Sequence, residues 1–436
     1  MIQNSNTRSG NIRAFDIFSS MGGGMIDIRA GVTELTYFED VLKNTITLTI
    51  QVTEAGLGGN KGIIDNLPIR GGEKAHIVFS DAEGNERKFK GDNALYVNRV
   101  RNLTKGTQID SYFIDFCSRE FLANEQSRVC KRYNGKISES VKSILTKATS
   151  GDSGLKIPTS KLGIIDKTLI DYNFIGNEKK PLYTCTWLAS KAIPESAGKA
   201  GASAGFLFYQ THDGFNFRSI DNIFTESYKK TFIYNNTSLK PEEYSGKILR
   251  YDISRDIDLH NNLLVGAYSN RTIFFDYYGM NYDVRDFTPK QQEGIETGGK
   301  FPIDSVADEF RLPVSRLMSR ILDIGTLPSG KSSEEELEQW KNKPDNPTWD
   351  AAQTMVQSLM RYNQLFTIQV KITLGGNFDL QAGDLIYCDF PELNDSSYNS
   401  VTGGIYMISS LAHELTPKTC FTYVTLVRDS YGRKSF

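Results

Sequence analysis

The chain has 436 residues, and its 50 Lys and Arg nearly balance 52 Asp and Glu, for a formal net charge of −2. With 39% hydrophobic and 23% charged residues, the composition argues against an intrinsically disordered chain, a collagen-like repeat or a polybasic nucleic-acid binder. The 25 Phe and 21 Tyr against 13 Pro favour β-sheet over a helical bundle.

The N-terminus and the cysteines indicate where the protein is made. Residues 1–10 are polar, and no later stretch approaches the roughly 18 to 20 apolar residues that span a bilayer. We therefore expect no membrane segment and a soluble protein made in a cytoplasm. The cysteines are odd in number and contain no C-x-x-C pair, which predicts buried free thiols rather than disulfides or structural zinc. They are Cys117, Cys130, Cys185, Cys388 and Cys420.

The N-terminal region has the two-residue period of β-strands. Residues 45–52 alternate strictly between polar and apolar side chains. The apolar face consists of Ile46, Leu48, Ile50 and Val52. Turn residues separate this strand from further strands, which are expected at 75–79, 94–100 and 109–116. Short strands without helices between them predict an antiparallel barrel or sandwich.

Helical patterns begin near residue 117. Ser138 is a candidate N-cap for one helix, and Pro181 begins a second. Residues 333–336 have the capping-box form of a short charged helix, and Asn346-Pro347 begins another helix that leads into the last strands. This last helix is expected to bury Trp349, Ala352, Val356 and Leu359.

These patterns predict a mainly β fold with α+β insertions, in which two similar antiparallel β-barrel domains are joined by mixed α/β regions. Residues 1–116 form the first barrel, and residues 117–205 form an α+β domain that ends in a flexible Gly/Ala joint. Residues 206–345 form a β-rich segment with a polar loop from about 286 to 300 and the short charged helix. Residues 346–436 form a helix and the second barrel, which strands from 206–285 complete.

An internal repeat supports two barrels of one design. Landmarks of the N-terminal region recur near the C-terminus in the same order and at nearly constant separation. Ile50-Gln-Val52 corresponds to Ile368-Gln-Val370, Gly71 to Gly383, Tyr96 to Tyr406, and Leu103-Thr104 to Leu415-Thr416. The alternative is that any two antiparallel sheets share alternating strands and glycine turns.

Several of these motifs are also those of a known family. An N-terminal barrel, a helical interruption, Leu380-Gln-Ala-Gly-Asp384, Gly403-Gly-Ile-Tyr406 and a closing strand before Arg428-Asp429 resemble the central hub protein of contractile phage tail baseplates. The T-even phage hub is its best-known member, and the hub portion of type VI secretion spike proteins is similar. The resemblance covers 25–116 and 350–436 best, and the chain departs from the T-even pattern at 56–65 and 286–347.

The resemblance implies a structural, non-enzymatic virion protein. Three copies would form a ring of six barrels, a symmetry adaptor that joins the hexameric tail tube, or its initiator, to a trimeric spike that can carry a cell-wall hydrolase. Wedge proteins of the baseplate are further partners, and DNA passes through the channel as cargo. The protein would be assembled in the host cytoplasm.

The sequence contains no convincing catalytic, cofactor-binding or metal-binding set, so we expect no cofactor. Gly201-Ala-Ser-Ala-Gly205 matches the nucleophile elbow G-x-S-x-G but lacks the preceding strand and following helix. Gly56-Leu-Gly-Gly-Asn-Lys-Gly62 lacks phosphate-loop spacing. No two of the histidines are spaced as in a metalloprotease, and His413-Glu414 is expected in a turn or at a barrel rim. The histidines are His76, His212, His260 and His413.

Two further features have an ordinary structural interpretation. Glu334 to Glu336 with Glu338 would form a solvated helix face rather than the two contrasting carboxylates of a glycosidase. Phe274-Phe275 and Tyr277-Tyr278 lack the basic residues that nucleic-acid binding needs.

Alternatives to a phage hub remain at this stage. The same fold would serve in a type VI secretion system or an extracellular contractile injection system. A β-rich carbohydrate-binding or hydrolytic protein would be active on glycans or cell wall. A nucleic-acid binder would show salt-dependent retention on DNA.

Overall fold

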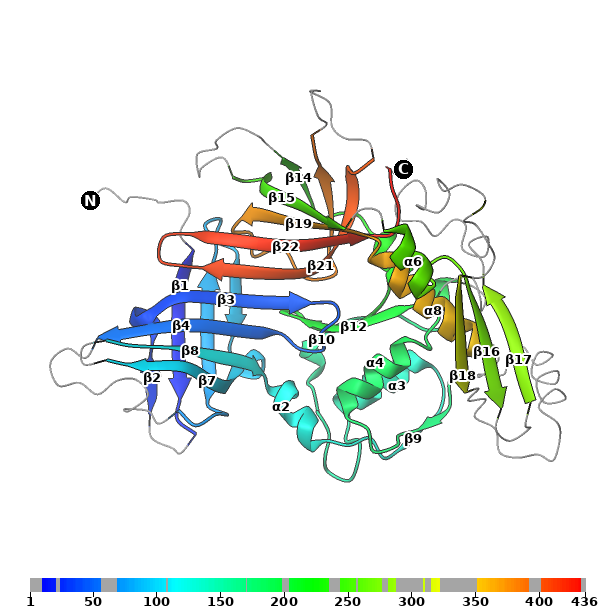
Figure 1. Ribbon diagram of the computed structural model, residues 1–436. Helices are drawn as coiled ribbons and strands as arrows, with labels where there is room; N and C mark the ends of the chain where they lie inside the picture. The colour runs from blue at the N-terminus through cyan, green and yellow to red at the C-terminus, as the bar shows by residue number, and fades with distance from the viewer. Residues whose placement is uncertain are drawn as a thin grey trace.

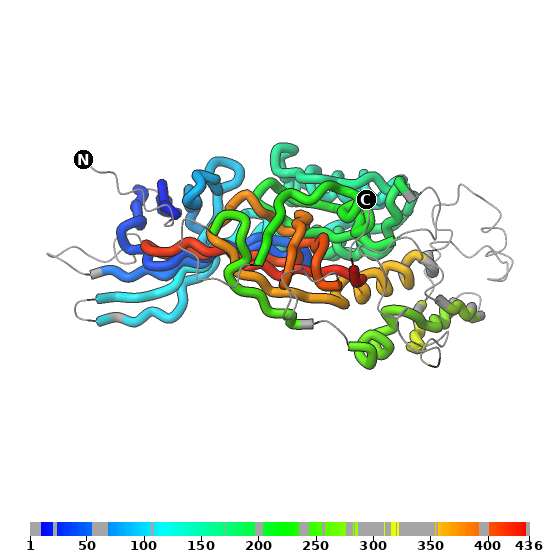
Figure 2. The backbone as a smooth tube through the Cα atoms, turned by 90° about the horizontal axis from the view of Figure 1, so that it is seen from above, coloured from blue at the N-terminus to red at the C-terminus, as the bar shows by residue number. Residues whose placement is uncertain are grey.

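The computed structural model describes residues 10–20, 24–55, 69–106, 109–169, 171–197, 204–234, 244–255, 258–276, 281–287, 309, 315–321, 351–391 and 401–432. Its main feature is a 14-stranded sheet that forms two β units side by side (Figure 1). Figures 1 and 2 show an elongated molecule, with the N-terminal strands at one end and a small three-stranded sheet at the other. The mainly β fold with α+β insertions is confirmed.

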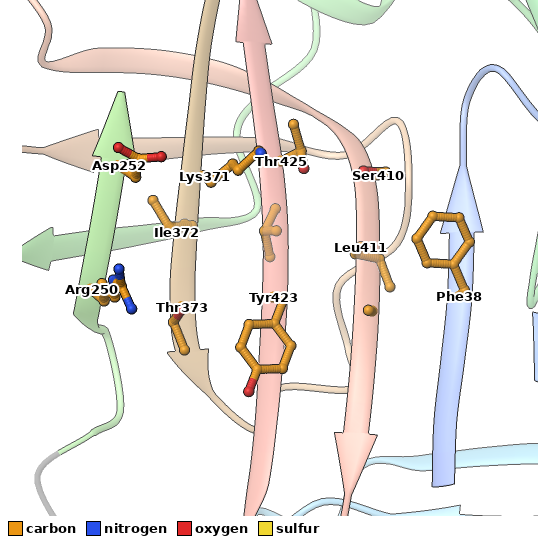
Figure 3. A pocket seen from close by; sticks show the side chains of 12 residues that line it. Phe38, Arg250, Asp252, Lys371, Ile372, Thr373, Ser410, Leu411, Tyr423 and Thr425 are labelled. Carbon is orange, nitrogen blue, oxygen red and sulfur yellow. The ribbon is translucent and has the colours of Figure 1, made fainter. Parts of the chain in front are cut away.

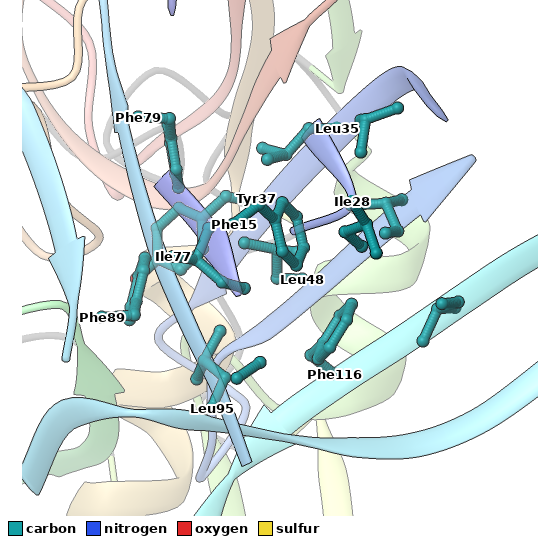
Figure 4. Close-up of a cluster of buried hydrophobic side chains, with 14 of the residues drawn as sticks. Phe15, Ile28, Leu35, Tyr37, Leu48, Ile77, Phe79, Phe89, Leu95 and Phe116 are labelled. Atoms are coloured by element: carbon teal, nitrogen blue, oxygen red, sulfur yellow. The ribbon is translucent and has the colours of Figure 1, made fainter. Parts of the chain in front are cut away.

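The N-terminal unit is a curled antiparallel sheet. Its strands are β1 (Asn11–Phe18), β2 (Met25–Asp27), β3 (Val32–Asp40), β4 (Thr47–Ala55), β5 (Lys74–Ser80), β6 (Glu86–Phe89), β7 (Leu95–Lys105) and β8 (Ile109–Ser118). They pair in the order β1-β5-β7-β8-β4-β3, with β2 added to β1 and β6 to β5. The alternation seen in the sequence turns Leu48 inward, where it packs with Phe15, Tyr37 and Phe116 (Figure 4).

The second unit is a six-stranded barrel that closes on itself. Its strands are β14 (Lys230–Tyr234), β15 (Lys247–Arg255), β19 (Ile368–Gly375), β20 (Leu385–Asp389), β21 (Gly404–Leu415) and β22 (Cys420–Arg428). They pair in the order β14-β20-β21-β22-β19-β15, and β15 returns to β14. Two segments far apart in sequence therefore build one core, which includes the buried residues Val370, Ile372, Tyr406 and Leu426.

An α+β unit lies between the two β units in the chain. Its elements are α2 (Arg119–Gln126), β9 (Arg132–Tyr133), α3 (Ile137–Thr146), β10 (Leu162–Ile165), β11 (Phe174–Ile175), α4 (Pro181–Ala189), β12 (Phe206–Thr211), β13 (Gly214–Ser219) and α5 (Ile220–Phe224). Pro181 begins α4 as expected. Ser138 is not an N-cap: α3 begins one residue before it, because the backbone of Lys136 forms a β-bridge with that of Asp171. Ser138 is buried, and its N–H donates to Thr168 Oγ1 at 3.1 Å.

A small sheet and two helices are inserted between the barrel strands β15 and β19. They comprise α6 (Leu259–Val265), β16 (Asn270–Asp276), β17 (Asn281–Phe287), β18 (Arg316–Ile321) and α8 (Ala351–Leu365). Phe274 on β16 packs against Val356 and Met360 of α8. The expected start of this helix at Asn346, the capping box at 333–336 and the loop at 288–300 lie outside the described residues. Short 3-10 helices occur at η1 (Arg29–Gly31), η2 (Gly91–Asn93), η3 (Thr159–Lys161) and η4 (Glu195–Ala197).

The two β units repeat one strand order. β5-β7-β8-β4-β3 of the first unit has its counterpart in β20-β21-β22-β19-β15 of the second. Gly72 N donates to Val97 O at 2.7 Å, and Gly383 N donates to Ile408 O at 2.8 Å. The register of the next ladder shifts directly after each of these acceptors. Equal strand order, equal glycine contacts and equal bulge positions support a duplicated unit.

The structure corrects the residues matched in the repeat. Gly72 rather than Gly71 corresponds to Gly383, and the other β7 landmarks move by one or two residues. When the strand pairing is followed from Val97 and from Ile408 across the ladders, Leu48 corresponds to Val370. The sequence match had paired Val370 with Val52, which lies four residues away from Leu48. A slip by an even number keeps every apolar side chain on the same face, so alternation alone could not detect it.

Candidate assembly interface

The two β units are joined by one strand pair, β3 with β21, which we call the seam. The strands run antiparallel over six residue pairs. The pairs are Leu35 with Leu415, Thr36 with Glu414, Tyr37 with His413, Phe38 with Ala412, Glu39 with Leu411 and Asp40 with Ser410. Strand β21 reaches this far because its first part pairs with β20 inside the barrel and its second part pairs with β3.

Aromatic packing fills the inner side of the seam. The rings of Tyr37 and His413 are stacked, with centroids 6.0 Å apart, and Phe378 packs on His413 at 4.6 Å. His413 Nδ1 lies 3.0 Å from Thr422 Oγ1. Burial, followed by the charge of Arg87, lowers the pKa of His413 well below its usual value. The expectation that His413 lies in a turn or at a rim was therefore wrong, because the residue is buried within β21.

A buried carboxylate joins the seam to both neighbouring parts of the chain. Glu39 is fully buried. It accepts hydrogen bonds from Tyr37 Oη at 2.6 Å, from the backbone N–H of His212 at 2.8 Å and from that of Ala382 at 2.8 Å. His212 follows β12 and Ala382 precedes β20, so one side chain connects the N-terminal unit, the α+β unit and the barrel. Three charge-assisted bonds make this junction stiff.

The seam makes a continuous antiparallel band of eight strands, in the order β7-β8-β4-β3-β21-β22-β19-β15. One face of the band covers the two cores, and the other is open. Figure 3 shows part of the open face, where Phe38, Lys371, Tyr423 and Arg250 project from neighbouring strands over a shallow hollow. The charges on this face are mixed: Glu34, Asp40, Asp115, Asp252 and Glu414 against Arg99, Arg101, Arg250 and Lys371.

A charged cluster stands at the β7 edge of the band. Asp115 Oδ2 lies 2.5 Å from Arg99 Nε and 3.0 Å from Arg101 Nε, and Thr49 Oγ1 donates to Asp115 Oδ1 at 2.8 Å. Burial would raise the pKa of Asp115, but these hydrogen bonds outweigh it and hold the pKa below its ordinary value. Arg101 also lies over the ring of Phe113 at 4.8 Å. The basic side chains of this edge are thus held in place.

Over most of its length, each end strand of the band has no strand partner on its outer side among the described residues. On the side away from β8, β7 pairs with β5 only at Leu95 and Tyr96. On the side away from β19, β15 pairs with β14 only at Lys247 and Ile248. Edge strands normally carry protection against pairing with other chains.

Comparison with known proteins identifies the fold. No protein-family model matches the sequence, and no curated protein matches it either. The solved structure of a tail protein from Neisseria meningitidis MC58 is 12% identical, with a TM-score of 0.50, and the match covers 97% of this chain and 96% of that one. The 43 kDa tail protein of prophage MuSo2 from Shewanella oneidensis is 10% identical, with a TM-score of 0.51, and the match covers 96% and 98%.

The chain has a tail-protein fold. The resemblance drawn from the sequence motifs is thereby confirmed at the level of the fold. The two matches extend over nearly the whole chain, so they include the α+β unit and the small sheet as well as both β units.

Within this tail-protein fold the other sequence candidates are dispersed. His76 lies on β5 against Phe18, with ring centroids 4.6 Å apart, and His212 lies beside Asp213 at 3.0 Å. His260 lies on α6. Of the G-x-S-x-G match, only Ala204 and Gly205 are described. The loop 56–62, the Glu334–Glu338 run and Tyr277-Tyr278 lie outside the described residues.

The described residues contain no cluster of three or more His, Cys, Asp or Glu that could hold a metal ion. In the same residues, no helix has the length and apolar character needed to cross a membrane. All five cysteines are free thiols; four are buried as expected, and Cys130 is exposed, which corrects that prediction.

Strand β3, which forms the seam with β21, was not predicted from the sequence. Residues 32–38 are rich in β-branched and aromatic side chains (Val32, Thr33, Thr36, Tyr37 and Phe38), and this composition would have indicated β3. The partnership of β3 with β21 had no comparable signal.

Proposed function

We propose that this chain is the subunit of a trimeric baseplate hub, the ring that joins the six-fold tail tube to the three-fold central spike of a contractile phage tail. The observation that carries the proposal is the seam: two equivalent β units sit edge to edge in one band whose two ends are open. A head-to-tail contact between copies generates a ring when its rotation closes. Three chains with two β units each would present six similar positions to the six-fold tube on one face of the ring. The other face would present three positions, one per chain, to the three-fold spike.

The open face of the band supports a passage role. In a closed ring this face would line the channel. It carries acidic and basic side chains in similar number, so a DNA backbone would meet little net attraction. A basic lining would bind DNA tightly, and a channel that DNA only traverses does not need such binding.

The mechanism is geometric rather than catalytic. The buried junction at Glu39 fixes the angle between the two β units, and the α+β unit and the small sheet offer outer surfaces for tube, spike and wedge proteins. Any activity on the cell wall would then belong to the spike. The protein would be located in the tail baseplate of the virion and assembled in the cytoplasm of the host.

Native mass tests the proposal. Light scattering on the purified chain is expected to give about 147 kDa, three times the 48.9 kDa of one chain. Averaged electron micrographs are expected to show a three-fold ring with six similar lobes around a hole. A chain that stays monomeric at micromolar concentration, and also when a candidate spike protein is added, contradicts the proposal.

A further inference from the structure

The repeat assigns a counterpart to each strand of the seam. Ladder by ladder, Leu35, Thr36 and Tyr37 of β3 correspond to Tyr251, Asp252 and Ile253 of β15. Both strands have a register shift at the same place, after Val32 in β3 and after Ile248 in β15. In the same way, Glu414 and Leu415 of β21 correspond to Thr104 and Lys105 of β7.

The two open edges are therefore the counterparts of the two paired ones. β3 and β21 meet inside the chain, whereas β15 and β7 stand at opposite ends of the band. We propose that β15 of one copy pairs antiparallel with β7 of the next copy in the register of the seam. Tyr251 then lies opposite Lys105, and Asp252 lies opposite Thr104. This proposal rests on the hub function and states which backbone edges close its ring.

Exposed apolar side chains mark the same place on both edges. Leu103 is 45% exposed and Ile253 is 36% exposed. Ile253 corresponds to Tyr37, and Leu103 lies at the level of His413. Tyr37 and His413 are the two residues whose rings are stacked and buried in the seam. Pairing of the edges would cover Leu103 with Ile253, as the seam covers Tyr37 with His413.

The irregularities of the two edges also match. β7 has one extra residue between Arg101 and Thr104, with Asn102 in a left-handed conformation at φ 54°. β15 has one extra residue between Ile253 and Arg255. The seam strands have no extra residue at this level. Because both edges carry the insertion at one level, neither strand has to slip relative to the other.

Cysteine cross-linking tests the register. In a Cys130→Ser background, the exposed residues Thr104 and Asp252 are replaced together, as Thr104→Cys with Asp252→Cys. Directly opposed residues of antiparallel strands have Cα atoms about 4.5 to 5.5 Å apart, within the range of a disulfide. Oxidation is expected to give species of two and three linked chains and none larger. Each single variant is expected to stay unlinked.

The chain supplies its own matched controls. Thr36→Cys with Glu414→Cys places the same pair in the seam and is expected to oxidise within one chain, which verifies folding and chemistry. Thr104→Cys with Arg250→Cys shifts the pair by two residues and is expected to link at least tenfold more slowly.

The outcomes separate this inference from the hub function. The mass can be trimeric and the seam control can form its disulfide while positions 104 and 252 do not link, or while the shifted pair links at an equal rate. Either result overturns the register and leaves the hub function standing. A monomeric chain without links overturns both. Linked species that grow beyond three chains show edge pairing without a trimeric ring and overturn the closure proposed here.

Discussion

The rings of Tyr37 and His413 stack across the seam with centroids 6.0 Å apart and planes inclined by 13°. One ring comes from the N-terminal unit and the other from the closed barrel, so this contact holds two β units at one angle. Both side chains are fully buried, and the contact is therefore sensitive to any change in the charge of the imidazole.

Acid is expected to weaken the protein through His413. Burial and the charge of Arg87 hold the pKa of this residue well below 6.5 in the folded state, so the unfolded chain binds the proton more readily. Its contribution is complete above pH 6.5 and is lost as the pH falls below that value. One histidine of this kind costs about 1.4 kcal/mol of unfolding free energy between pH 7.5 and 5.5.

Urea unfolding of the native protein and of His413→Phe at the two pH values measures this effect. The Phe variant suits the aromatic surroundings and is expected to lose less stability on acidification. His260→Asn, on the exposed side of α6, is the control and is expected to keep the native pH dependence. If His413→Phe and the native protein lose stability equally, the imidazole is not the acid-sensitive group.

The repeated glycines are expected to respond differently to the same substitution. Gly72 and Gly383 have similar backbone angles, with φ of 87° and 89°. A Cβ on Gly72 meets nothing within 4 Å, whereas on Gly383 it would lie 2.1 Å from Tyr209 Oη. Gly72→Ala is expected to cost about 1 to 2 kcal/mol of unfolding free energy from the backbone alone. Gly383→Ala is expected to cost about 1 to 3 kcal/mol more, because the buried Tyr209 must move.

Urea midpoints of the two alanine variants measure that difference. Equal losses would mean that Tyr209 relaxes without cost and that the turn before β20 is not packed as tightly as the structure indicates.

A buried ion network is expected to hold α8 on the barrel. The Arg361 side chain is 2% exposed and bonds to Asp221 of α5 at 2.7 Å and to the fully buried Asp429 after β22. Arg361→Met would leave the Asp429 carboxylate buried without its cation, which typically costs about 3 to 5 kcal/mol. Lys371→Met, on the open face of the band, is the control and is expected to change stability by less than about 0.5 kcal/mol. A small loss at Arg361 in thermal or urea unfolding would contradict a stabilising role for the network.

One thiol is expected to react in the folded protein. Cys130 is exposed. Burial raises the pKa of Cys117 and of Cys420 to about 12, and it also raises that of Cys185 and Cys388, so these four thiols stay protonated and enclosed. A thiol reagent such as DTNB should titrate one group in the native chain, five after denaturation and none in native Cys130→Ser. Rapid reaction of a second thiol would show that one of the cores opens.

Local patterns predicted much of the fold. The alternation of residues 45–52 indicated β4 and its inner face, and Pro181 indicated the start of α4, because side-chain period and a fixed proline φ act over a few residues. The same patterns did not place the start of α3, where a backbone β-bridge between Lys136 and Asp171 sets the helix boundary. They also placed His413 in a turn or at a barrel rim, whereas it lies within β21, because the pairing of β21 with β3 leaves no local signal in the sequence.

The sequence by itself determined that this chain is mainly β, that its strands present one apolar face each, and that a unit recurs within it. These properties depend on neighbours along the chain. The sequence also predicted that strands from 206–285 complete the second barrel. Only the tertiary structure decided that these strands are β14 and β15, that β3 meets β21, and that β7 and β15 remain at the ends of the band. Strand edges expose the same backbone groups whatever the side chains, so which edges meet is decided by the packing of whole units and not by local sequence.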